Sequence, residues 1–147
     1  MQEKSNTEEQ LQKWVKHQLD SAVRELINQG LFSSVMVEAR PAWVFPFGLL
    51  IGMIREQDQR KGFDWFISGD FPTARISSDV ASTAREAARH FALQWQLEAK
   101  RIEDRASRDS NGMQSDADQA SQRLVERAQS LYELVEQDPL WQEIQSD

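Results

Sequence analysis

The eleven-residue apolar run Val44–Ile54 constrains the fold more than any other part of this sequence. A membrane-spanning helix needs roughly 20 apolar residues, so this run is too short to cross a bilayer and is expected in a protein core. Gly48 and Gly52 form a G-x-x-x-G spacing within it, but that pattern carries meaning only in a long lipid-facing helix. The run therefore indicates a folded domain with its own core.

Residues 47–55 are interpreted as a strand that pairs antiparallel with the aromatic segment Phe63–Ser68 across a polar turn at residues 56–62. A short helix is the alternative for 47–55, because periodicity cannot separate the two in a short apolar run. We favour the strand because a polar link followed by an aromatic segment is typical of a hairpin.

Two further extended pieces are expected before this hairpin. Ser34–Glu38 is a short strand candidate that Pro41 interrupts, and Trp43–Phe45 is the second. The sequence therefore predicts a sheet of three or four strands.

Apolar residues recur at helical spacing on both sides of the sheet segment. The first predicted helix runs from about Glu8 to Gln29, with a capping box at Thr7–Gln10 and a stop at Gly30. A second begins near Ser78 or Ser82 and ends at about Ala106, with another capping box at Thr83–Glu86. Its main stripe comprises Ala84, Ala88, Phe91, Trp95, Ala99 and Ile102.

Leu93 and Leu97 lie on the opposite side of the second predicted helix. A helix that is apolar on two sides is usually packed on two sides, so we expect it to be central, between the sheet and another helix. After a polar loop at 108–116, a last helix is expected to end at Asp138–Pro139, with one more turn beyond. Its stripe comprises Ala117, Ala120, Leu124, Ala128, Leu131 and Val135.

These elements define an α+β fold with an N-terminal helix, a small antiparallel sheet, a long central helix and a C-terminal helix. We expect an α+β core domain at 1–107. An acidic helical extension at 108–147 would pack on the core or on a second subunit. Residues 98–147 carry twelve acids and six bases, so most of the net charge of −7 belongs to that extension.

Charge and composition exclude several classes of protein. The net charge of −7 argues against a nucleic-acid binder, which would show a basic face. The absence of Cys rules out disulfides and thiolate chemistry, and the polar N-terminus resembles no signal peptide. We therefore expect a cytoplasmic protein with no membrane association.

No catalytic or metal-binding constellation is evident. Of two histidines, His17 is expected at the surface, and His90 is either a packing residue or a hydrogen-bonding residue in a pocket. No His-x-x-x-His spacing is present, so neither a metal nor a cofactor is predicted.

The most distinctive stretch is Ser68–Thr73, where a Gly between Ser and Asp ends an aromatic segment. One interpretation places Asp70 and Thr73 at the rim of a pocket, together with Arg75 and with Arg85 or Arg89, where they bind a ligand or partner. The other has Asp70 accept backbone amides and cap the turn.

Five tryptophans are spread over every predicted element, and four of them are expected to be core aromatics. Trp141 lies in an acidic tail. It either docks back onto the domain or offers a hydrophobic anchor to a partner.

Pro41-Ala42-Trp43 and, above all, Trp65 to Thr73 with its Ile-Ser-Gly-Asp-x-Pro-Thr turn give the chain a resemblance to a known family. The chain resembles a family of small bacterial proteins known only as a domain of unknown function, over roughly residues 8–105. The resemblance implies the domain outline and no activity.

Three hypotheses for function follow. The first is a non-enzymatic interaction protein of immunity, antitoxin or regulatory type that binds one protein partner. The second is a small-molecule binder or modest enzyme with a pocket at the Asp70–Thr73 turn and a contribution from His90. The third is an oligomeric scaffold, such as a homodimer, in which the last helix packs between subunits.

Overall fold

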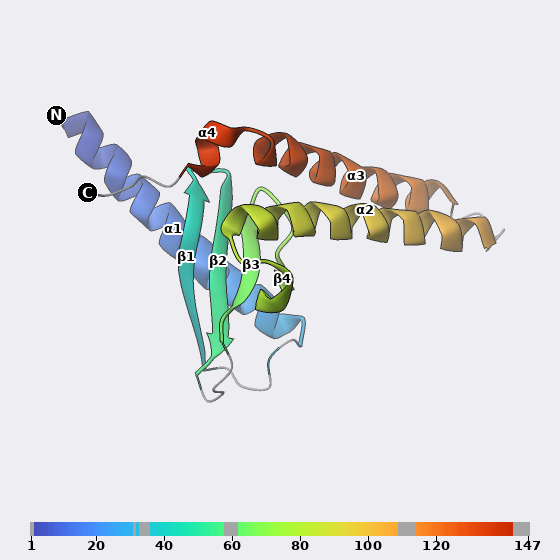
Figure 1. Cartoon of the computed structure of the whole chain (residues 1–147), viewed down its shortest axis with the longest axis horizontal. Coiled ribbons are helices and arrows are strands. Elements are labelled where there is room, and N and C mark those ends of the chain that lie inside the picture. The colour runs from blue at the N-terminus through green and yellow to red at the C-terminus, as the bar shows by residue number, and fades with distance from the viewer. Residues whose placement is uncertain (1, 31, 33–35, 58–61, 109–113, 143–147) are drawn as a thin grey trace. The chain divides into compact units, whose positions relative to one another are not determined.

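The computed structural model of the chain describes residues 2–30, 32, 36–57, 62–108 and 114–142. It has an α+β fold, as predicted (Figure 1). The elements are α1 (Gln2–Asn28), β1 (Val37–Phe45), β2 (Leu49–Glu56), β3 (Asp64–Gly69), β4 (Ala74–Ile76), the 3₁₀ turn η1 (Ser78–Val80), α2 (Ala84–Arg108), α3 (Gln114–Val135) and α4 (Asp138–Trp141). The chain divides into two compact units, Met1–Ala87 and Ala88–Asp147, which are described separately.

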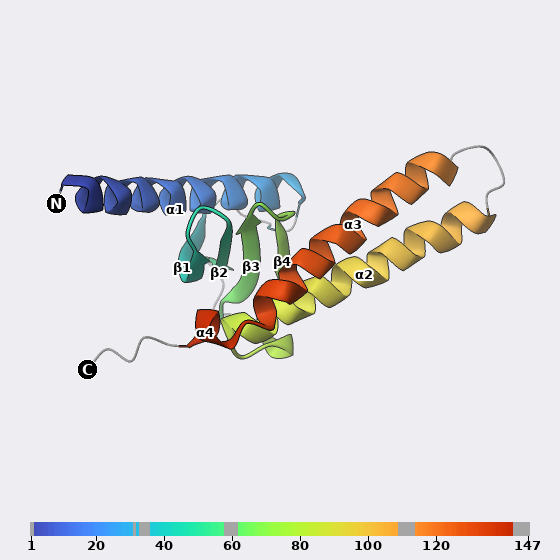
Figure 2. The same cartoon turned by 90° about the horizontal axis from the view of Figure 1, so that it is seen from above.

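Helix α1 ends where the sequence predicts and begins earlier. Gly30 adopts a positive φ of 75°, and its amide donates to Ile27 O at 2.9 Å, which closes the helix. The helix begins at Gln2, so the expected start at the Thr7 capping box is wrong. Gln, Glu and Lys are good helix formers, and with these residues at positions 2–4 the helix continues past Thr7. The N-terminal part of α1 consequently extends beyond β1 (Figures 1 and 2).

The four strands form one antiparallel sheet in the order β1-β2-β3-β4. The predicted hairpin of β2 with β3 is confirmed, with Gly52 opposite Phe66. The expected interruption at Pro41 is wrong, because β1 continues through it with a register shift between Pro41 and Trp43. Proline is tolerated here because β1 is an edge strand. Part of the strand expected at Ser34–Glu38 lies outside the described residues.

Helix α1 packs its apolar face on one face of this sheet. The fully buried centre of that contact comprises Ala22, Leu26, Leu50, Ile54 and Phe66. Burial of each large side chain contributes about 1.5–3 kcal/mol. Ser68 Oγ lies 2.8 Å from Gln18 Oε1, so a side-chain hydrogen bond also joins β3 to the helix. The fold of this unit is therefore held by one helix on one sheet.

The start of α2 shows a cap close to the predicted one. The Glu86 amide donates to Thr83 Oγ1 at 3.1 Å, as a capping box requires. The Glu86 carboxylate, however, accepts from the amide and hydroxyl of Ser82, at 2.8 and 2.9 Å. One amide of the first turn of α2, that of Glu86, and the amide of Ser82 just before the helix are thus each satisfied by a side chain.

In the second unit α2 and α3 run side by side (Figures 1 and 2). Most of both predicted stripes is buried, including Ala88, Phe91, Trp95, Ala99, Ala128, Leu131 and Val135. Ala120 is exposed, and its neighbour Ser121 is buried instead, donating to Glu103 Oε1 at 2.7 Å. Leu93 and Leu97 are 42% and 50% exposed, so the expectation that this second face of α2 is packed is wrong.

Candidate functional site

The turn from Ser68 to Thr73 is fixed by its backbone. Gly69 adopts a φ of 110°, which favours glycine, and a Cβ at this position would collide with Gly48 O. The Asp70 amide donates to that same carbonyl at 2.8 Å. The carbonyl of Thr73 accepts from Gln29 Nε2 at 3.5 Å. The motif therefore joins β3 to the β1–β2 turn and to the end of α1.

Arg75 is engaged in two contacts on the first unit. Its Nη2 lies 2.9 Å from Asp64 Oδ2, and its guanidinium lies 4.9 Å from the centre of the Phe32 ring. A polar hollow of about 650 Å³ opens beside it, lined by Asp64, Arg75 and the Ser77–Asp79 turn. Among the described residues that line this hollow, Arg75 is present and Asp70 and Thr73 are not, so this hollow does not bring the three predicted residues together.

Of the other predicted residues, Arg85 lies in the first unit, at the start of α2, and Arg89, His90 and Trp141 lie in the second. Arg89 is exposed and His90 is half-buried, both on the first turns of α2. Trp141, in α4, donates from Nε1 to Leu134 O at 2.8 Å, so this indole folds back onto α3. The residues singled out from sequence for a site are thus divided between the two units, four in the first and three in the second.

Two properties of the described residues, whether they could hold a metal ion and whether they include a membrane-spanning helix, bear on what kind of site is present. Within the described ranges no group of three or more His, Asp or Glu side chains could hold a metal ion. Among the helices of those ranges, none combines the length and apolar character needed to cross a membrane.

The outer edge of β1 carries a feature that sequence reasoning missed. The Gln57 amide donates to Met36 O at 2.9 Å, which makes this a hydrogen-bonded pair at the start of the β1–β2 ladder. In an antiparallel pair such residues alternate with residues whose N–H and C=O point away from the partner strand. The backbone groups of Val37 and Ala39 therefore face outward, as does the carbonyl of Pro41.

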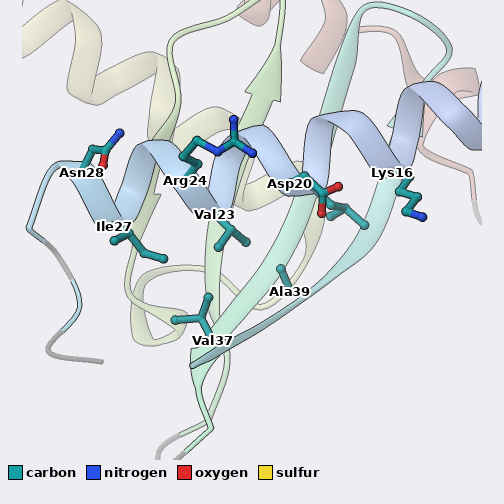
Figure 3. A pocket seen from close by; sticks show the side chains of 9 residues that line it. Lys16, Asp20, Val23, Arg24, Ile27, Asn28, Val37 and Ala39 are labelled. Carbon is teal, nitrogen blue, oxygen red and sulfur yellow. The ribbon is translucent and has the colours of Figure 1, made fainter. Parts of the chain in front are cut away.

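A hollow of about 520 Å³ lies between α1 and this edge of the sheet (Figure 3). Its apolar lining comes from Leu19, Val23 and Ile27 of α1 and from Val37 and Ala39 of β1. Charged side chains of α1 stand among them, namely Lys16, Asp20 and Arg24. The outward-facing backbone thus lies beside a groove with an apolar floor and a charged rim.

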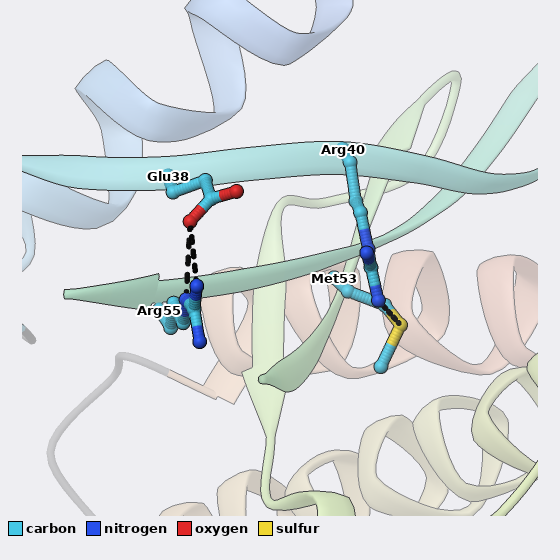
Figure 4. A network of polar contacts seen from close by, with 4 residues as sticks. All are labelled: Glu38, Arg40, Met53 and Arg55. Atoms are coloured by element: carbon cyan, nitrogen blue, oxygen red, sulfur yellow. Dashed lines mark hydrogen bonds and ion pairs between the residues drawn. The ribbon is translucent and has the colours of Figure 1, made fainter. Parts of the chain in front are cut away.

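The opposite face of the same segment is charged. Arg55 donates from Nε and Nη2 to Glu38 Oε2, both at 3.1 Å, and Arg40 Nη2 lies 3.8 Å from Met53 Sδ (Figure 4). The guanidinium carbons of Arg40 and Arg55 lie 4.3 and 4.4 Å from the centre of the Phe63 ring. Cation–π contact holds both arginines against one aromatic ring.

We call Val37–Pro41 of β1, together with the α1 side of the groove, the β1 edge site. Its residues come from segments about 20 positions apart, and each belongs to an ordinary amphipathic pattern. Pro41, within an extended stretch in which apolar and charged residues alternate, was the available signal, because proline inside a strand marks an edge.

Residues 8–141 match the family described as Domain of unknown function (DUF4826), and the chain belongs to this family. The match extends through α3 into α4, so the segment after Ala106 is included in it. No curated protein and no solved structure shows significant similarity to the chain.

Proposed function

We propose that this protein is a non-enzymatic protein-interaction module, of the immunity, antitoxin or regulatory type, and that it binds its partner at the β1 edge site. The partner contributes an extended segment that adds to the sheet as a further strand. The observation that carries this proposal is the outward-facing backbone of Val37 and Ala39 beside the α1–β1 groove.

Strand addition divides recognition between backbone and side chains. Main-chain hydrogen bonds to Val37 and Ala39 supply affinity, and alternate side chains of the added strand supply specificity. Side chains on one face of that strand meet the apolar floor of the groove. Those on the other face meet Glu38 and Arg40, so a complementary strand carries a base opposite Glu38 and an acid opposite Arg40.

The length of the available edge limits what can bind. The register shift after Pro41 interrupts the regular ladder, so the regular edge runs only from Val37 to Pro41. An edge of this length pairs with only a short stretch of an added strand.

Site-specific photo-crosslinking in living cells tests this function. A photo-reactive amino acid at Ala39 should form adducts with an extended segment of a partner chain, and the same amino acid at Val80, which is 49% exposed, should not. Val37→Pro removes one outward N–H and leaves the ladder to β2 intact, because proline is accepted at the first residue of a strand. It should reduce the adduct yield at least fivefold.

Equal adduct yields at Ala39 and Val80 would contradict the proposal. So would a yield at Ala39 that Val37→Pro leaves unchanged, because the added strand would then not use that N–H.

A further inference from the structure

The β1 edge site is complementary to itself, and from this we infer that the strand it accepts is β1 of a second copy of the chain. This inference rests on the proposed function and names its partner. The two β1 strands run antiparallel about a two-fold axis that passes beside Ala39.

Backbone hydrogen bonding is consistent with this arrangement. Ala39 faces Ala39 of the second copy, and each donates its outward N–H to the carbonyl of the other. Val37 then faces Pro41 of the second copy and donates to its carbonyl. Pro41 has no N–H to offer, yet its outward carbonyl is the group that this pairing needs. Four hydrogen bonds join the two strands.

Charge selects this register over its neighbours. With Ala39 opposite Ala39, Glu38 lies opposite Arg40 of the second copy, and Arg40 opposite its Glu38. A shift by two residues in one direction places Glu38 opposite Glu38, and the opposite shift places Arg40 opposite Arg40. Like charges directly across a strand pair are destabilising, and opposite charges stabilise it. Only the Ala39-centred register pairs every charge with its opposite.

The two faces also match in polarity. Val37, Ala39 and Pro41 alternate with Glu38 and Arg40 along the strand, so the apolar side chains share the face that carries α1. In the paired strands, the apolar side chains of the two copies lie next to each other on the face that carries the groove. The charged side chains of the two copies lie next to each other on the opposite face. Glu38 is already held by Arg55 at 3.1 Å, so it is positioned to contact Arg40 of the second copy as well.

Mixing of two charge variants tests the register. Glu38→Arg alone puts Arg opposite Arg in both cross-strand pairs, and Arg40→Glu alone puts Glu opposite Glu. Each should weaken self-association of the full chain, measured by analytical ultracentrifugation, about 10- to 100-fold. An equimolar mixture restores opposite charges in a heterodimer and should recover the wild-type affinity. Glu98→Arg and Arg101→Glu, made on an exposed pair of α2, are matched controls that should change nothing.

Disulfide trapping tests the axis, because the chain contains no cysteine. Directly opposed residues in a hydrogen-bonded antiparallel pair have Cα atoms about 5.5 Å apart, within the range that a disulfide spans. Ala39→Cys should therefore form a covalent dimer on mild oxidation, and Val80→Cys should not.

A wild-type chain that is monomeric at high micromolar concentration would overturn this inference. If the chain is monomeric but photo-crosslinks at Ala39 join it to other proteins, the proposed function stands and only the inference of self-pairing fails. If no crosslinks form, the proposed function and the inference both fail. A dimer that neither the charge variants nor Ala39→Cys affects would also refute pairing through β1.

Discussion

Replacement of Gly52 by alanine should destabilise the sheet at its most crowded point. A Cβ at this position would lie 2.5 Å from both Cε1 and Cζ of Phe66 and 2.7 Å from Arg40 O. The Phe66 ring is fully buried against α1, and the carbonyl belongs to the β1 ladder, so neither neighbour can retreat cheaply. The clash tests whether Phe66 lies across β2 as the structure shows.

Overpacking of a well-packed core costs about 1–3 kcal/mol, and two rigid neighbours place Gly52→Ala near the upper end. Alanine restricts the unfolded chain more than glycine does, which stabilises the folded state by about 0.5–1 kcal/mol and offsets part of this loss. The net expectation is a loss of about 2 kcal/mol, or about 4–8 °C in Tm for a chain of this size. Gly62→Ala is the control, since its Cβ would have no neighbour within 4 Å, and it should cost nothing.

Urea unfolding followed by circular dichroism gives these values. A double-mutant cycle sharpens the result, because Phe66→Leu removes the ring atoms that a Cβ at Gly52 would meet. The double variant should lose at least about 1 kcal/mol less than the two single losses combined. Unchanged stability of Gly52→Ala, or strict additivity in the cycle, would refute the packing described.

Three smaller changes test the second unit and the start of α2. Thr83→Ala removes the acceptor for the Glu86 amide and should cost about 1 kcal/mol in urea unfolding, whereas an unaffected midpoint would mean that the cap contributes nothing. Ser121→Ala removes the donor to Glu103 and should lower the free energy of unfolding by about 1 kcal/mol. If the lost hydrogen bond is the cause, adding Glu103→Gln to Ser121→Ala should give no further loss. Trp141→Phe keeps an aromatic ring but loses the donor to α3, so amide exchange in α4 should rise about fivefold; equal exchange would show that the indole bond does not hold α4.

Local signals in the sequence predicted some boundaries well and others poorly. Gly30 ends α1 because a positive φ there suits glycine, and this signal acts over a few residues. Thr7 failed as a start because a capping residue does not exclude helix before it. Strand β4 was not expected, since the three residues Ala74–Ile76 are too few to show a period.

The edge position of β1 depended on tertiary structure that no single segment contains. The sequence predicts that Pro41 interrupts the strand, but in the structure its nitrogen faces away from β2 and the ladder misses no donor there. Leu93 and Leu97 show the reverse error, because their apolar stripe predicts a packed face and the structure leaves both side chains exposed. The β1 edge site needed both facts, an open edge and a helix beside it, and neither is local in sequence.

The unequal lengths of the two sheet edges limit how far the inferred self-association through β1 could proceed. When two copies pair through β1, the outermost strands of the combined sheet are two copies of β4, each with only three residues. So short a strand offers too few main-chain groups to recruit another chain. If the pair forms as inferred, it is a closed two-fold assembly and not the start of a fibre, and its mass should saturate at twice 17.0 kDa however concentrated the protein becomes.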